Sequence, residues 1–196
     1  MKRLTAFVAS MFLALALAVP VLGDFDPDEN YMAKMLDAVA IGDEEAGYAA
    51  EQSRNEKIET LDLEWSPISF EDLLLLSKIM YAEAGSCWLG DEWRLNVGEV
   101  VLNRVESPEF PETIREVLEQ PGQYYGKNST YFARLNPGRE CAELALRLLE
   151  GERNMEPSVV FQANFRQGGG TYLTMTDTQL GSTYFCYSIR PHLYEG

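Results

Sequence analysis

The chain has 196 residues and a formal net charge of −15, with 46% hydrophobic and 11% aromatic residues. This length allows one domain with a single sizeable core, and the composition is that of a globular protein rather than a disordered or collagen-like one. The acidic charge argues against nucleic acid and anionic membranes as partners, because binding to phosphates depends on clustered Lys and Arg. An uncharged or zwitterionic polymer such as a glycan is compatible with it.

The first residues form the pattern of a cleavable secretory signal. Lys2 and Arg3 precede an apolar run over residues 6–19, and a small-residue boundary follows at residues 21–23. The run is short for a membrane-spanning helix, which needs about 20 apolar residues. We therefore expect residues 1–23 to be removed, which leaves an exported, monomeric protein without stable membrane association. An uncleaved membrane anchor is the alternative.

Residues 24–66 are acidic and are predicted to form a helical lead-in to the main domain. Apolar residues recur at helical spacing over residues 31–39, and a second helix is predicted over residues 44–57. Such helices bury an apolar face against a larger body, so we expect them to pack on the main domain. A flexible spacer is the alternative.

The main domain is predicted to occupy residues 67–196 and to begin with helices. Ser69 and Asp72 form a capping arrangement, and Gly85 is suited to end the helix that they start. Trp93 recurs with valines at helical spacing, which indicates a core residue. Pro121 to Leu135 has the composition of a loop. The four helices are predicted over residues 70–84, 91–106, 111–120 and 136–151.

The last part of the chain changes to strand patterns. Strands are predicted over residues 159–164, 171–175 and 183–188, with glycine-containing turns between them. Helices followed by a small antiparallel sheet make an α+β fold that is mainly helical.

The cysteine and histidine content limits the possible metal sites. Cys87, Cys141 and Cys186 are an odd number for an exported protein, so one disulfide with a leftover thiol and three unpaired cysteines are both open. Cys141 lies on the apolar stripe of a predicted helix, which favours a buried, inert thiol. A single histidine, His192, excludes a multi-His metal site, and we expect no metal or cofactor.

Glu83 is a candidate catalytic residue near the end of the first helix of the main domain. Leu76, Ile79 and Met80 lie seven, four and three residues before it, so they share its helical face. A carboxyl at the end of an apolar stripe is costly to ionise, and desolvation raises its pKa. A protonated Glu can donate its proton to the oxygen of a breaking glycosidic bond. The alternative is a Glu that reaches solvent past the last turn.

A series of ordered blocks gives a more specific signal. They are residues 79–85 (IMYAEAG), 97–105 (VGEVVLNRV), 107–111 (SPEFP), 120–124 (QPGQY), the helix of residues 141–151 and the strand 160–164 (VFQAN). Together these blocks resemble the SleB-type cell wall hydrolases, which are the spore-cortex-lytic enzymes and their relatives. The resemblance covers roughly residues 70–190.

The resemblance implies a lysozyme-like α+β fold and cleavage of peptidoglycan between N-acetylmuramic acid and N-acetylglucosamine. It implies lytic transglycosylation, in which one Glu, here Glu83, acts first as acid and then as base. The muramic acid C6 hydroxyl would then replace water as the nucleophile, which would explain the lack of a convincing second catalytic carboxylate. Glu99 and Asp177 are candidates to approach the site, but their spacing does not decide it.

Substrate-binding roles are expected for several other residues. Gln123 and Tyr124 offer an amide for sugar hydroxyl or acetamido groups and an aromatic face for stacking. Tyr81 could flank the acid, and Gln162 could point from its strand into the cleft. Asn103 and Arg104 are interpreted instead as structural residues at a helix end.

The chain departs from the family pattern at two places. Family members commonly have Gly-Glu-Pro where this chain has Gly85-Ser86-Cys87-Trp88, and many have Gln-Phe-Ser where it has Gln123-Tyr124-Tyr125. These differences concern the substrate subsites more than the acid.

Two other functions are compatible with the sequence. Residues 85–88 match part of the papain-type nucleophile signature, so a cysteine peptidase would use Cys87 with His192. A non-catalytic wall-binding or spore-structural protein of the same fold is the second alternative. Alkylation of the thiols would inactivate the cysteine peptidase but not a Glu83 glycosidase. Release of muropeptides from peptidoglycan would distinguish the glycosidase from the non-catalytic protein.

Overall fold

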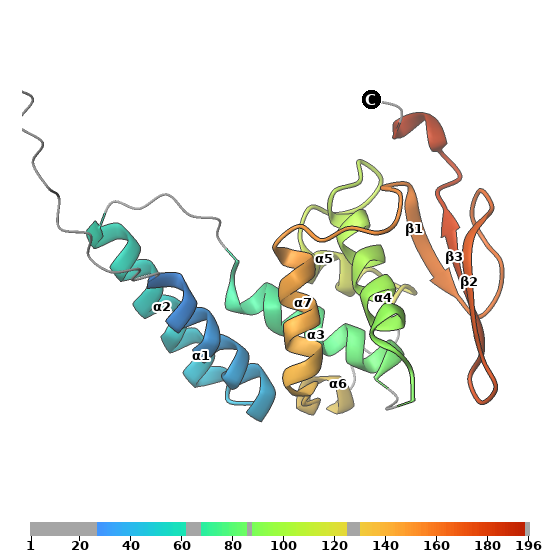
Figure 1. The fold of residues 1–196 in the computed structure, drawn as a ribbon. Coiled ribbons are helices and arrows are strands. Elements are labelled where there is room, and N and C mark those ends of the chain that lie inside the picture. Colours follow the sequence, from blue (N-terminus) through green and yellow to red (C-terminus); the bar gives the residue numbers. More distant parts are fainter. Residues whose placement is uncertain (1–26, 62–67, 86–87, 125–129, 195–196) are drawn as a thin grey trace, which may run out of the picture.

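A computed structural model describes residues 27–61, 68–85, 88–124 and 130–194, which form a mainly helical body with a small sheet along one side (Figure 1). The predicted α+β class is confirmed. The elements are α1 (Pro27–Ile41), α2 (Glu44–Leu61), α3 (Phe70–Ala84), α4 (Asp91–Val105), α5 (Ile114–Glu119), α6 (Thr130–Arg134), α7 (Gly138–Leu149), β1 (Val159–Ala163), β2 (Thr171–Asp177), β3 (Gly181–Tyr187) and the 3-10 helix η1 (Pro191–Leu193).

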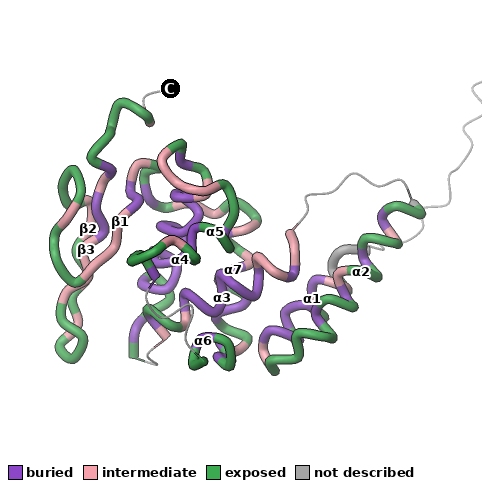
Figure 2. The backbone as a smooth tube through the Cα atoms, turned by 180° about the vertical axis from the view of Figure 1, so that it is seen from behind, coloured by how far each residue is buried: buried purple, intermediate pink, exposed green. Residues whose placement is uncertain are grey.

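The chain before the main body forms two helices, α1 and α2, that pack against each other. Met35 and Val39 of α1 are fully buried, and α1 also packs on α7. The ring of Tyr48 in α2 meets Phe70 of α3 edge to face, with ring centres 4.9 Å apart. In Figure 2 the buried side of α1 faces the body and the outer sides of both helices are exposed. The lead-in helices therefore share one core with the helices that follow.

Helices α3, α4 and α7 form the centre of the molecule. Leu73, Leu76 and Met80 of α3 are fully buried, as the continuous apolar run of this helix requires. Ser69 caps α3, because its hydroxyl accepts the Asp72 N–H at 3.0 Å. The lack of a side chain at Gly98 of α4 leaves room for the side chains of Leu148 and Met80, since an added Cβ atom would lie 2.5 Å from Leu148 Cδ1.

A second apolar cluster joins α4 to the sheet. Trp93, Val97 and Val100 pack against Val159 and Phe185 from the strands. Trp93 is therefore a core residue, as its helical spacing with valines predicts.

The sheet is antiparallel, with strand order β1-β3-β2. Side chains of α4 hold β1 in place: the Asn103 amide donates to the Val159 carbonyl at 3.0 Å, and Arg104 Nε donates to the Val160 carbonyl at 2.6 Å. These bonds confirm the structural roles expected for Asn103 and Arg104. They also place Gln162, two residues further along β1, beside the C-terminal end of α4.

The structure corrects two predicted helix starts and one predicted loop. Helix α5 begins at Ile114 rather than at Pro111, because the Thr113 hydroxyl accepts the Glu116 N–H at 3.2 Å and caps the helix there. The predicted loop of residues 121–135 contains the short helix α6, whose Phe132 is buried. Helix α7 begins at Gly138 rather than at residue 136.

Two of the three cysteines lie in the described part of the chain. Cys141 and Cys186 are both buried and unpaired, so no disulfide joins them. Desolvation raises the pKa of the Cys141 thiol to about 11, which confirms an inert thiol at this position. Cys87 and the predicted signal at residues 1–23 lie outside the described residues. In the described part of the chain, every helix is too short or too polar to cross a membrane.

Candidate functional site

A cavity of about 220 Å³ opens where four segments of the chain meet. These are the C-terminal ends of α3 and α4, the turn after α5, and the end of β1 with the loop that follows it. Its described lining residues are Glu83, Arg104, Gly122, Gln123, Tyr124, Gln162, Ala163, Phe165 and Gln167. Most of these side chains are polar, so the cavity suits a ligand with many hydrogen-bonding groups.

Glu83 stands where the buried stripe of α3 reaches the surface. Leu76, Ile79 and Met80 on the same face are buried, whereas Glu83 is exposed and faces the cavity. The surrounding protein still displaces enough water from the carboxyl to raise the pKa of Glu83 above its ordinary value. The side chain is thus open to a ligand and retains its proton to a higher pH than a freely hydrated Glu.

Arg104 forms the wall of the cavity together with aromatic rings. Its guanidinium carbon lies 5.1 Å from the centre of the Phe110 ring and 5.2 Å from that of Tyr124. Arg104 makes no ion pair with any described residue, although it is almost fully buried. A buried cation without a counter-ion is costly, so a negative or strongly polar ligand group would be favoured beside it.

Several polar atoms of the cavity residues lack hydrogen-bond partners. They are Arg104 Nη1, the Tyr124 hydroxyl and Gln162 Oε1, each shielded from solvent and without a partner among the described residues. Buried polar groups in native proteins are nearly always paired, so unpaired ones that cluster around one cavity indicate a binding site. Burial raises the pKa of Tyr124, while the charge of Arg104 lowers it and that of Glu83 raises it. The Tyr124 phenol therefore lies within electrostatic reach of both charged groups.

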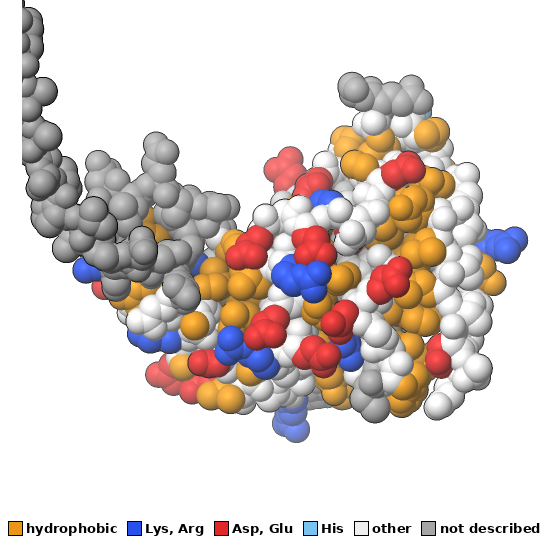
Figure 3. Space-filling view, viewed as in Figure 1, with side chains coloured by type: hydrophobic (Ala, Val, Ile, Leu, Met, Phe, Trp, Pro, Cys, Tyr) orange, Lys and Arg blue, Asp and Glu red, His pale blue; other side chains and the backbone are white. Residues whose placement is uncertain are grey.

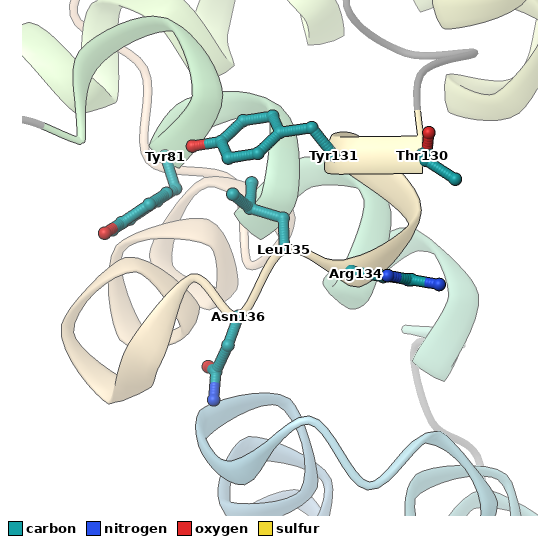
Figure 4. Close-up of a pocket in the computed structure, with 6 residues that line it drawn as sticks. All are labelled: Tyr81, Thr130, Tyr131, Arg134, Leu135 and Asn136. Atoms are coloured by element: carbon teal, nitrogen blue, oxygen red, sulfur yellow. The ribbon is translucent and has the colours of Figure 1, made fainter.

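The structure brings together four of the five residues predicted for the site. Glu83, Gln123, Tyr124 and Gln162 line the cavity. Tyr81 does not, because side chains two positions apart on a helix point about 160° away from each other. It lines a second cavity of about 440 Å³ with Thr130, Tyr131, Arg134, Leu135 and Asn136 (Figure 4).

The two other carboxylates considered from the sequence do not line the cavity. Glu99 is fully buried, and its Oε1 accepts the Asn154 and Met155 N–H groups at 2.7 and 2.6 Å. Asp177 lies at the β2–β3 turn, where it accepts backbone N–H groups of that turn. Glu83 is therefore the only carboxylate among the described residues that line the cavity.

Five lining residues were not predicted for the site, and three of them, Arg104, Phe165 and Gln167, carry polar or aromatic side chains. Arg104 is interpreted from the sequence as a structural residue rather than a ligand, yet only its Nε donates to β1 and its side chain also lines the cavity. Phe165 and Gln167 follow β1, and Phe165 is 60% exposed at the cavity, where its ring is free to stack on a sugar. The sequence signal that indicates Phe165 and Gln167 as site residues is the cluster of polar and aromatic residues directly after a strand.

His192 is far from the segment that contains the papain-like signature. It lies in η1 with an exposed side chain, and the neighbouring Tyr194 hydroxyl pairs with Ser107 at 2.6 Å, just after the C-terminal end of α4. Trp88 precedes the N-terminal end of α4, and a helix of 15 residues is about 22 Å long. Cys87 itself lies outside the described residues, so its pairing with His192 stays untested. The described residues contain no cluster of three or more His, Cys, Asp or Glu side chains that could hold a metal.

Comparison with known proteins gives one family match. Residues 90–186 match the family model described as Cell Wall Hydrolase. The matched segment contains α4, the turn at Gln123 and Tyr124, the strands β1 and β2, and β3 up to Cys186. It begins after Glu83, so it covers most of the cavity wall but not the carboxyl. No curated protein and no solved structure matches the chain.

Proposed function

Since the chain belongs to the SleB-type cell wall hydrolase family, we propose that it cleaves the glycan strands of peptidoglycan between N-acetylmuramic acid and N-acetylglucosamine, with Glu83 as the catalytic acid. The observation that carries this proposal is the position of Glu83. It is a carboxyl with a raised pKa, facing a cavity whose other described lining residues are uncharged or cationic. The predicted export signal fits a substrate outside the cytoplasm.

The proposed reaction is a lytic transglycosylation. Protonated Glu83 donates its proton to the bridging oxygen, the bond from that oxygen to the muramic acid C1 breaks, and the N-acetylglucosamine hydroxyl leaves. The C6 hydroxyl of the same muramic acid then attacks C1, and the Glu83 carboxylate takes its proton. The product is a 1,6-anhydro sugar, and Glu83 returns to its protonated state.

The number of carboxylates supports this reaction over the two-carboxylate mechanisms. Retaining glycosidases use two carboxyl groups about 5–5.5 Å apart, and inverting ones use two that are further separated. Glu83 has no carboxylate partner among the described lining residues, since Glu99 and Asp177 are held elsewhere by backbone N–H groups. An internal hydroxyl as nucleophile needs only one acid–base residue.

The remaining cavity residues supply groups suited to amino sugars. The amides of Gln123 and Gln162 can pair with acetamido or hydroxyl groups, and the exposed ring of Phe165 offers a stacking face. The unpaired hydrogen-bonding atoms of Arg104 and Tyr124 provide donors deeper in the wall. These contacts would hold the strand with its glycosidic oxygen at Glu83.

The test is to incubate the protein with purified peptidoglycan and to analyse the released fragments by mass spectrometry. We expect anhydro-muropeptides from the wild-type protein and a loss of activity of about 10²–10⁴-fold in Glu83→Gln, which keeps the shape of the side chain but cannot donate the proton. Glu45→Gln is the matched control, because Glu45 is exposed on α2 and lies outside the cavity.

Each alternative has its own outcome in this assay. Activity retained by Glu83→Gln refutes the assignment of the acid, and reducing ends in place of anhydro ends indicate hydrolysis. Binding to peptidoglycan without release of fragments supports the wall-binding protein. Activity that is abolished by thiol alkylation supports the cysteine peptidase.

A further inference from the structure

We propose that the groove formed by Tyr81, Tyr131 and Arg134 binds the acidic peptide stem that branches from the glycan strand. This inference rests on the proposed function, because the strand must first lie at Glu83. The groove is the second cavity, of about 440 Å³, and it is separate from the one that contains the acid. Nothing in the proposed chemistry uses its residues.

The residues that line the groove differ in chemical character from one side to the other. Figure 4 shows Tyr81 and Tyr131 near one end with the Leu135 side chain close to them, while Arg134 extends toward the other end beside α6. Tyr131 is 64% exposed, although a large aromatic ring gains from being covered. An extended ligand with apolar side chains and a carboxylate at one end matches this arrangement.

The charge of the groove is unusual for this chain. The protein has a formal net charge of −15, yet no Asp or Glu is found among the described residues that line the groove. The guanidinium of Arg134 forms no ion pair or hydrogen bond with another described residue. The exposed arginines on α7 differ in this respect, since Arg139 pairs with Glu143 and Arg147 with Glu152. An unpaired guanidinium is suited to a carboxylate, which it can bind through two parallel hydrogen bonds.

The distance between the two cavities favours a peptide over the sugar itself. Tyr81 and Glu83 are about 3 Å apart along α3 but point to opposite sides of a helix that is about 10–12 Å wide with its side chains. The hydroxyl groups of a sugar bound at Glu83 cannot cross this width. A branch of four residues, at about 3.3 Å per residue, can reach around the end of the helix.

The experiment compares binding to two forms of one substrate. One form is soluble glycan strands that carry their peptides, and the other is the same strands after an amidase has removed the peptides. Each form is titrated into the full chain carrying Glu83→Gln, and binding is measured by calorimetry. Arg134→Gln and Tyr131→Ala are then added to this background. Both are exposed surface positions, so the fold is expected to tolerate the changes. Arg147→Gln is the matched control, since it removes an exposed arginine outside the groove.

We expect Arg134→Gln to weaken binding of the peptide-bearing strands about 10-fold and to leave binding of the stripped strands unchanged. An equal loss of affinity for both kinds of strand would show that the groove binds sugar. Unchanged affinity for both would show that the groove binds neither the peptide nor the sugar. Both results overturn the inference, as does a failure of the peptide-bearing strands to bind at all. The comparison needs no turnover, so its failure is distinguishable from failure of the Glu83 assignment, which the fragment assay decides.

Discussion

The guanidinium carbon of Arg104 lies 5.2 Å from the centre of the Tyr124 ring, in the wall of the cavity that contains Glu83. The Tyr124 hydroxyl is buried, has no hydrogen-bond partner among the described residues, and is influenced by the charges of both Arg104 and Glu83. Substitution of Tyr124 by Phe therefore separates the contribution of the hydroxyl oxygen from that of the ring.

Tyr124→Phe is expected to lower activity without lowering stability. The ring that packs against Arg104 is kept, and removal of an unpaired buried hydroxyl is neutral or stabilises the fold by up to about 1–3 kcal/mol. If the hydroxyl binds substrate, kcat/KM falls about 10-fold. Thermal unfolding and initial rates on peptidoglycan measure the two effects. Tyr172→Phe is the control, because its hydroxyl lies outside the cavity and bonds the Asn154 carbonyl. Unchanged kcat/KM in Tyr124→Phe would mean that the hydroxyl has no contact with substrate.

The pH dependence of activity is expected to follow the raised pKa of Glu83. Desolvation places this pKa above the ordinary value of 4.5, and the acid step requires the protonated form. Activity should therefore persist above the pH at which a hydrated Glu ionises and then fall as pH rises through the raised pKa. A pH profile of kcat/KM measures this fall in activity. A fall centred on the ordinary pKa of a Glu would contradict the desolvation of the carboxyl.

The same shift predicts a pH-dependent effect on stability. A carboxyl with a raised folded-state pKa contributes stability that is fully present below its unfolded pKa and is lost as pH rises through the folded pKa. Gln carries no charge at any pH, so Glu83→Gln should gain in melting temperature relative to the wild-type protein as pH is raised from below 4.5 to neutral. A difference in melting temperature that does not change with pH would contradict this prediction.

Gly98→Ala tests the close packing of the central helices. An added Cβ atom would lie 2.5 Å from Leu148 Cδ1 and 2.8 Å from Met80 Sδ, so these buried side chains would have to shift. We expect a loss of about 1–3 kcal/mol in the free energy of unfolding, as for other overpacked cores. Gly90→Ser is the control, because an added Cβ atom there meets nothing within 4 Å and Ser is a good residue before a helix. Urea unfolding measures the stability of both variants. If Gly98→Ala is as stable as Gly90→Ser, the tight packing at Gly98 is refuted.

Glu99 is predicted to hold the loop before β1 in place rather than to take part in catalysis. Its Oε1 accepts two backbone N–H groups at 2.7 and 2.6 Å, whereas Oε2 has no partner among the described residues. Glu99→Ala leaves both donors unpaired and should lower stability by about 2–4 kcal/mol. Glu99→Gln keeps one acceptor oxygen and should fold with more than a tenth of the wild-type activity. A loss of activity in Glu99→Gln as large as that in Glu83→Gln would instead make Glu99 part of the reaction.

The elements with local signals can be predicted from the sequence. The apolar run from Phe70 to Ala84, with the capping Ser69, defined α3 and put Glu83 near its end. Strand patterns separated by glycines predicted the three strands with errors of a few residues at their ends. These features depend on helix and strand periodicity and on caps, which act between residues close together in the chain.

Only the tertiary structure decided which side chains meet at Glu83. Gln162 reaches the cavity because Asn103 and Arg104 bind the carbonyls of Val159 and Val160 and so fix β1 against α4. Tyr81 was expected beside the acid, but its direction from α3 places it in the second cavity. Such contacts join residues that are far apart in the chain. They depend on how whole elements pack, and the spacing of residues within one element carries no information about that packing.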